Sequence, residues 1–192
     1  IPFVSAYPKK HIVKRYFDLA SQGIKNFDKV NPFNYELELY GYPITNVEKR
    51  KHILFHVGGL DYRRIDNNIL LNIIKEFASR AKRKVYLLDE PKNPNLGFFK
   101  RNLVNYKIEF IDKMNKENLI NFVGENIYFA FVPDGGTAHL CTTLTNTLVY
   151  FGPGAVWVWY PWSKSEARHV KTYSNRTEVW ETKGKYLHRF IF

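Results

Sequence analysis

The sequence predicts an α/β fold built on a doubly wound parallel sheet, and two observations lead to this prediction. Short apolar runs alternate with segments of helical spacing between residues 51 and 155. A glycine pair directly follows one of these runs, at 58–59, and a second pair follows another run after a single acid, at 135–136. Strands separated by helix-length segments form right-handed crossovers, which build parallel strands with helices on both faces.

The elements are predicted from hydrophobic periodicity and from capping residues. Asp66 and Asn115 suit the N-caps of two helices, and Gly23 suits the C-terminal end of another. Helices are predicted over 11–20, 65–83, 95–104, 115–126 and 137–144, and strands over 35–40, 52–57, 85–88, 108–111, 127–132, 148–151, 178–181 and 186–192. The core face of the second helix is predicted to carry Ile69, Leu70, Ile73, Ile74, Phe77 and Ala78.

The domain organisation follows from this pattern and from the length of the chain. A length of 192 residues, 45% of them hydrophobic, suffices for one real core and argues against wholesale disorder. We predict a lead-in helix and linker over 1–50, the core over 51–155, and a Trp-rich extension packed on the core over 156–192. No apolar run reaches the ~18 residues that span a bilayer. The chain begins with Ile1 rather than Met, which we interpret as the start of a trimmed piece of a longer protein.

The charge and the single cysteine restrict the class of partner. Twenty-nine Lys and Arg against 18 Asp and Glu give a net charge of +11, which attracts polyanions such as phosphorylated sugars, nucleic acid or an anionic membrane. The basic residues are scattered, so a nucleic-acid-binding stripe is not indicated. Cys141 stands alone, which excludes an internal disulfide and a cysteine metal cluster. We predict a buried, inert thiol there.

The segment from Asp134 to His139 is the most informative candidate site. An apolar run ends there at an acid and two glycines, Gly135 and Gly136, and Thr137 then opens a helix. A helix N-terminus with close-approach glycines favours an anion, and His139 would lie in its first turn. The alternative is a tight strand-to-helix turn in which Asp134 only caps backbone donors.

Two other strand ends offer candidate ligand contacts. Gly58 and Gly59 end the first strand of the core. Two cations, Arg63 and Arg64, follow shortly after, and this pair suits a phosphate clamp, whereas one arginine near a glycine turn would be ordinary. Asp89 and Glu90 follow the next strand. A carboxylate at this strand end either accepts hydrogen bonds from a ribose or is a solvated loop acid. An aromatic block at 157–162 suits core or lid packing, with a wall for a sugar ring as the alternative.

These motifs resemble those of the bacterial ADP-heptose:lipopolysaccharide heptosyltransferases. The run 131–140 resembles their Asp-Thr/Ser-Gly-x-x-His-Leu segment, and 151–153 resembles the Phe-Gly-Pro that follows one strand later. The run 54–59 with Asp61 and Arg63 resembles their donor-phosphate loop. The lead-in from Tyr7 to Gly23 is similar to the linker into their C-terminal half, so the resemblance covers about residues 5–155.

The resemblance implies the C-terminal, donor-binding half of a GT-B glycosyltransferase, a Rossmann-like domain. It implies an inverting transfer from an ADP- or UDP-sugar, with no further cofactor. No metal is expected, because the sequence shows no metal-ligand spacing. Catalytic roles are implied for Asp134, His139 and Arg63, and donor contacts for Gly58, Gly59, Arg63, Glu90, Gly135, Gly136 and Thr137. Gly135 stands where the family has a hydroxyl residue, and Gly58-Gly59 replace a hydroxyl pair, which leaves the sugar and the base open.

The resemblance also implies partners and a location. We expect an N-terminal GT-B domain, which this chain lacks, to provide the general base and the site for a glycolipid or saccharide acceptor. We expect a cytoplasmic protein at the inner face of a bacterial membrane, in lipopolysaccharide, lipo-oligosaccharide or surface polysaccharide synthesis, with no nucleic-acid partner. Two alternatives stay open: a non-catalytic nucleotide- or sugar-phosphate-binding or scaffolding module, and a nucleic-acid-binding α/β domain.

Overall fold

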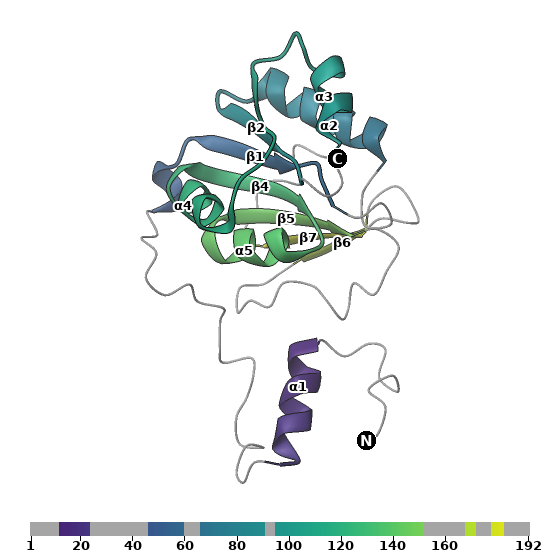
Figure 1. The fold of residues 1–192 in the computed structure, drawn as a ribbon, viewed down its shortest axis with the longest axis vertical. Coiled ribbons are helices and arrows are strands. Elements are labelled where there is room, and N and C mark those ends of the chain that lie inside the picture. The colour runs from purple at the N-terminus through teal and green to yellow at the C-terminus, as the bar shows by residue number, and fades with distance from the viewer. Residues whose placement is uncertain are drawn as a thin grey trace.

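One twisted sheet organises the chain (Figure 1). The computed structural model describes residues 12–23, 46–59, 66–90, 95–151, 168–171 and 178–182. The strand order is β3-β2-β1-β4-β5-β7-β6. The strands are β1 (His52–His56), β2 (Lys84–Leu88), β3 (Ile108–Ile111), β4 (Ile127–Pro133), β5 (Asn146–Phe151), β6 (Arg168–Lys171) and β7 (Glu178–Thr182). The first five pair in parallel, which confirms the predicted fold class.

Helices cover the parallel part of the sheet on both faces. The helical elements are α1 (Ile12–Ser21), a 3-10 turn η4 (Val47–Lys49), α2 (Asn67–Arg80), α3 (Leu96–Asn102), α4 (Lys116–Asn126) and α5 (Gly136–Leu144). Two separate core clusters show the layers: α2 and α3 pack on one face, and α4 and α5 on the other (Figure 1). None of the described helices combines the length and apolar character of a membrane span.

The direction of strand addition reverses between β1 and β4. The chain runs outward from β1 through β2 to β3, then returns to place β4 on the other side of β1 and continues to β5. The loops that leave β1 and β4 therefore turn to opposite faces of the sheet. Such a reversal opens a crevice at the carboxyl ends of the two strands.

Local capping explains where the helices begin. The Asp66 carboxylate accepts hydrogen bonds from the N–H groups of Asn68 (2.8 Å) and Ile69 (3.3 Å), as predicted. Asn115 caps α4 in the same way through Asn118 N–H at 2.8 Å. Both N-caps identified from the sequence are therefore confirmed.

The predicted helix over 65–83 is too long, and one face assignment is wrong. Helix α2 ends at Arg80 because Ala81 is extended and β2 begins three residues later at Lys84. Ile69 is 43% exposed, whereas Leu71 is 6% exposed and lies in the core. The wide apolar stripe of this helix does not by itself define the rotation at which it packs.

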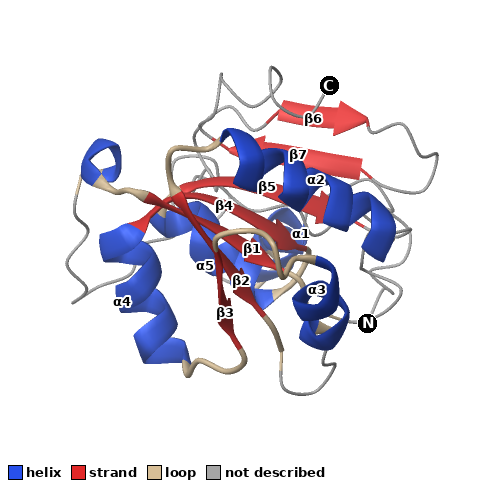
Figure 2. Cartoon of the chain, turned by 90° about the horizontal axis from the view of Figure 1, so that it is seen from above, coloured by secondary structure: helices blue, strands red, loops and turns tan. Residues whose placement is uncertain are grey.

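The C-terminal region adds two strands to the sheet. Strand β7 pairs antiparallel with β5, and β6 pairs antiparallel with β7, so the sheet continues beyond β5 (Figure 2). The sequence predicted β7 but not β6, which has one apolar residue among its four. The strands predicted over 35–40 and 186–192 lie outside the described residues, and the domain limits stay a prediction.

A buried arginine holds the amino-terminal edge of the sheet together. Arg50 is 2% exposed, and its Nη1 donates to the carbonyl oxygens of Val123, Ile127 and Leu144 at 3.3, 3.3 and 2.6 Å. These acceptors lie near the C-terminal ends of α4 and α5, where helix dipoles favour a cation. Burial lowers the pKa of Arg50 from its ordinary value.

We predict that Arg50→Met destabilises the fold by on the order of 3 kcal/mol, because buried carbonyl groups lose a charged donor. Chemical denaturation monitored by circular dichroism measures this change. Lys51→Met is the matched control, since the neighbouring side chain is exposed and its loss is expected to change stability by less than about 0.5 kcal/mol. An unchanged unfolding midpoint for Arg50→Met would contradict the assignment.

Candidate functional site

Two loops flank the crevice at the reversal of strand order. Residues 57–59 follow β1, and residues 134–136 follow β4, the strand that lies directly beside it. The two glycine motifs identified in the sequence lie in these two loops. The structure therefore brings Gly58-Gly59 and Asp134-Gly135-Gly136 to neighbouring strand ends, at the edge where ligands bind in open α/β sheets.

The loop after β4 leads into helix α5, whose first backbone N–H groups have no acceptor within the helix. Gly135 is the N-cap, and its carbonyl accepts from Ala138 N–H (3.1 Å) and His139 N–H (3.4 Å). Within the described residues, no backbone carbonyl accepts from the N–H of Gly136 or Thr137. Unpaired N–H groups and the helix dipole make this end of α5 suited to an anion.

The backbone conformation requires a glycine at one of the two glycine positions of this loop but not at the other. Gly135 has a φ of 153° and a ψ of −169°, a region that essentially excludes side chains. Gly136 has no such requirement, and a Cβ added there would meet no atom within 4 Å. Because alanine favours a helix more than glycine does, the folded chain alone gives no reason for Gly136. Open space above a helix N-terminus is what an approaching ligand needs.

Asp134 and His139 lie near one another at this edge. Asp134 N–H donates to the carbonyl of Tyr150 at 2.9 Å, which joins the loop to β5. Burial lowers the pKa of His139, and the negative charge of Asp134 opposes that effect. The imidazole is therefore mainly neutral at pH 7 in the free chain, and a bound anion would favour its protonation.

The first loop is packed against the end of β2. Gly58 is buried, and a Cβ there would lie 2.6 Å from Glu90 N and 2.7 Å from Glu90 Cβ. Gly59 has a φ of 106° and is also buried. The structure thus supplies a packing reason for Gly58, and the contact of this loop with phosphate stays a prediction.

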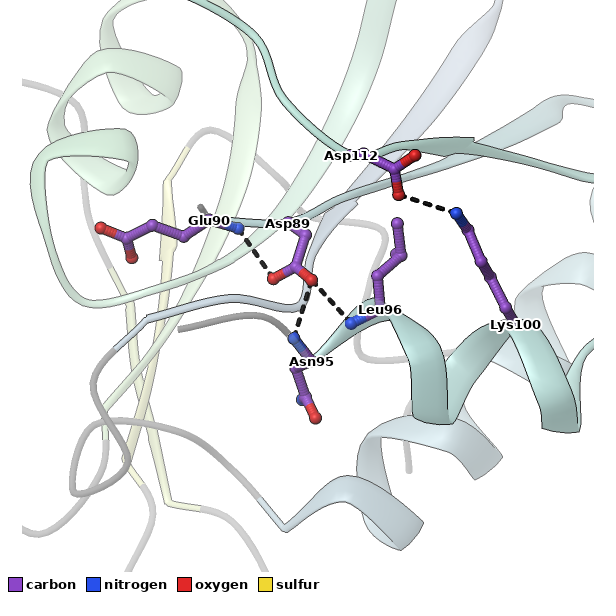
Figure 3. A network of polar contacts seen from close by, with 6 residues as sticks. All are labelled: Asp89, Glu90, Asn95, Leu96, Lys100 and Asp112. Atoms are coloured by element: carbon purple, nitrogen blue, oxygen red, sulfur yellow. Dashed lines mark hydrogen bonds and ion pairs between the residues drawn. The ribbon is translucent and has the colours of Figure 1, made fainter. Parts of the chain in front are cut away.

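Asp89 is a buried anchor for helix α3, so its interpretation as a solvated loop acid is wrong. It is 6% exposed, and its carboxylate accepts from the N–H groups of Glu90 (2.7 Å), Asn95 (2.7 Å) and Leu96 (2.6 Å) (Figure 3). Charge-assisted bonds to N–H groups stabilise a helix start. The Glu90 side chain points away from this network (Figure 3) and is partly exposed.

A pair of asparagines joins the first loop to two helices. Asn95 Nδ2 donates to Val57 O (3.2 Å) and Asn67 Oδ1 (2.8 Å), and Asn67 Nδ2 donates back to Asn95 Oδ1 (3.0 Å). These hydrogen bonds were missed in the sequence analysis because both residues are typical asparagines at the start of a helix. The bonds fix the position at which the chain leaves β1.

Other predicted residues either lie outside the described part of the chain or have no ligand role. Arg63, Asp61 and the aromatic block at 157–162 are outside it, so their roles stay predictions. Cys141 is buried, as predicted, and burial raises the pKa of its thiol to about 12, which disfavours the reactive thiolate.

Comparison with solved structures identifies the fold. The E. coli ADP-heptose lps heptosyltransferase II aligns with a TM-score of 0.58 over 85% of this chain and 55% of its own, at 16% identity. The E. coli heptosyltransferase WaaC with ADP aligns with a TM-score of 0.50 over 65% of this chain and 38% of its own, at 20% identity.

The chain has the fold of these heptosyltransferases. In the described residues, this fold is the sheet whose strand order reverses between β1 and β4. The aligned chain spans 55% and 38% of the two enzymes' lengths. No protein-family model matches the sequence. No curated protein matches it by sequence either.

We predict that His56 makes the fold sensitive to acid. His56 is 6% exposed, its Nδ1 has no partner among the described residues, and burial lowers its pKa to about 4 despite the opposing charge of Asp89. The unfolded chain binds this proton at a higher pH than the folded chain does. Stability is therefore full above pH ~6.5 and falls as the pH drops toward ~4, by up to about 3 kcal/mol.

Thermal denaturation between pH 4 and 7 measures this dependence. His56→Phe keeps a ring without a titrating nitrogen, so we expect a flatter profile. His52 and His139 also have lowered pKa values and leave a residual slope in the variant. Identical profiles for the two proteins would exclude His56 as the source.

Proposed function

We propose that this chain is the nucleotide-sugar-binding part of an inverting glycosyltransferase. The observation that carries the proposal is the exposed N-terminus of α5 beside the reversal of strand order, with free space over Gly136. That edge is where a diphosphate finds N–H donors and a helix dipole. The fold shared with WaaC, a heptosyltransferase solved with ADP, supports a nucleotide as the ligand.

The proposed roles of the described residues follow their positions at this edge, and the role of Arg63 follows the sequence prediction. The N–H groups at 136–137 bind the donor diphosphate, and Arg63 from the first loop adds a cation. Glu90, partly exposed at the end of β2, accepts hydrogen bonds from the ribose. His139 lies in the first turn of α5 and takes up a proton from water when the negatively charged diphosphate binds, while Asp134 orients the loop.

The proposed reaction forms one glycosidic bond and breaks one sugar–phosphate bond. An acceptor hydroxyl attacks the anomeric carbon and loses its proton to a base, and the nucleoside diphosphate leaves from the opposite side. Donors at the helix end stabilise the charge that develops on the leaving diphosphate. An ADP- or UDP-sugar is the proposed donor, and no further cofactor is proposed.

The remaining parts of the reaction are assigned to a second domain. We propose that a preceding GT-B half provides the acceptor site and the general base, with a glycolipid or saccharide as acceptor. The net charge of +11 suits contact with an anionic membrane surface at the cytoplasmic face. The proposed pathway is bacterial lipopolysaccharide, lipo-oligosaccharide or surface polysaccharide synthesis.

A non-catalytic binding module is the second candidate. It is favoured by one fact, that the chain aligns with 55% or less of the length of the enzymes whose fold it shares. In that case the crevice binds a nucleotide or sugar phosphate without transfer. Nucleotide affinity without turnover, measured in the longest available form of the protein, would favour the module.

We predict saturable binding of ADP or UDP in calorimetric titrations that also include GDP and CMP. Asp134→Ala is expected to weaken the binding about tenfold, because the loop loses its orienting carboxylate, and Arg63→Ala is expected to weaken it similarly. Circular dichroism of each variant shows whether the fold is intact. An absence of binding by all four nucleotides would contradict a complete donor site in this chain.

Gly136→Ala is predicted to separate ligand binding from folding. The added methyl occupies the open space at the end of α5, so nucleotide affinity falls, while the free protein keeps its stability or gains up to about 1 kcal/mol. Calorimetry and chemical denaturation measure the two effects.

Gly97→Ala is the matched control for this substitution. Gly97 is an exposed glycine in the first turn of α3, and a Cβ there meets only Arg101 Nη1, at 3.7 Å. It lies outside the proposed site, so nucleotide affinity should not change. If Gly136→Ala bound nucleotide as tightly as Gly97→Ala, the α5 terminus would not be the ligand site.

A further inference from the structure

One buried tyrosine is bonded to both strand ends that border the crevice. Tyr150 lies on β5 and is fully buried. Its backbone carbonyl accepts the N–H of Asp134 at 2.9 Å, which anchors the loop after β4. Its phenol O–H donates to the carbonyl of His56 at 3.2 Å, at the last residue of β1.

The second of these bonds crosses a whole strand. Strand β4 lies between β1 and β5. The residue of β4 in register with Tyr150 is Pro133, which has no N–H to donate. The ring of Tyr150 stacks on Phe131 of β4, with centroids 5.0 Å apart and planes at 29°. The phenol thereby reaches the carbonyl of His56 on the far side of β4.

The place of this bond gives it a consequence for the site. His56 is two residues before Gly58, and Asp134 is two residues before Gly136. Any change in the distance between these two strand ends changes the width of the crevice. The two bonds of Tyr150 hold that distance from a rigid position in the core, since its ring is packed on all sides.

We propose that Tyr150 is a positioning residue that sets the spacing of the two crevice loops for a bound nucleoside diphosphate. The proposal rests on the proposed function for the identity of the ligand. Tyr150 does not touch the ligand, because it has no exposed surface. It acts through the backbone of His56 and Asp134.

Tyr150→Phe tests this role with the smallest change. Phenylalanine keeps the ring that stacks on Phe131 and keeps the carbonyl that accepts from Asp134, and it removes the O–H that donates to His56. We expect ADP affinity to fall about three- to tenfold, the effect of one hydrogen bond. We also expect faster backbone amide hydrogen exchange at 57–59 and at 134–136 in the free protein.

The matched control is Tyr128→Phe. Tyr128 lies at the opposite end of β4, partly exposed, with the Arg83 guanidinium 4.0 Å from its ring centroid. Loss of this hydroxyl should leave ADP affinity and exchange at both loops unchanged. Exchange in β2, residues 84–88, serves as the internal reference for global stability in each protein.

The outcomes separate this proposal from the proposed function. Weaker ADP binding and faster exchange at both loops, with β2 unchanged, would support the positioning role. Equal acceleration in β2, or no local change at all, would overturn it. If the unmodified chain binds no ADP, that result counts against the ADP-binding function, and the exchange data alone then decide whether Tyr150 holds the loops.

Discussion

The reversal of strand order between β1 and β4 is the constraint on which the rest of the structure depends. Helices α2 and α5, which follow these two strands, pack on opposite faces of the sheet. The residues that come directly after β1 and after β4 therefore lie at the same edge. The positions of Gly58 and Gly136 in the fold follow from this topology, although 78 residues separate them in the sequence.

Stability and ligand contact are assigned to different groups around this sheet. At the amino-terminal edge, Arg50 binds carbonyl groups at the ends of two helices. At the carboxyl-terminal edge, Asp89 and Asn95 fix the start of α3 and the exit from β1. The N–H groups of Gly136 and Thr137 at the start of α5 have no backbone acceptor among the described residues, which is why the proposed anion site is placed there.

The sequence identified most of the elements because their signals are local. Apolar runs separated by segments of helical spacing located the five parallel strands, and capping residues located the starts of α2 and α4. Strand β6 was missed because four residues with a single apolar side chain form a strand only when a neighbour supplies the ladder of hydrogen bonds. The exposure of Ile69 was missed because the packing angle of a helix is set by its neighbours.

The sequence alone determined which residues end the strands, since a glycine or an acid after an apolar run is a local property of the chain. Tertiary structure decided what those residues do. Asp89 and Glu90 are adjacent acids, and only the fold buries the first against backbone donors and leaves the second partly exposed. The role of Tyr150 has no local signal, because its partners come from other strands and hydrogen bonds between distant strands are created only when the sheet assembles.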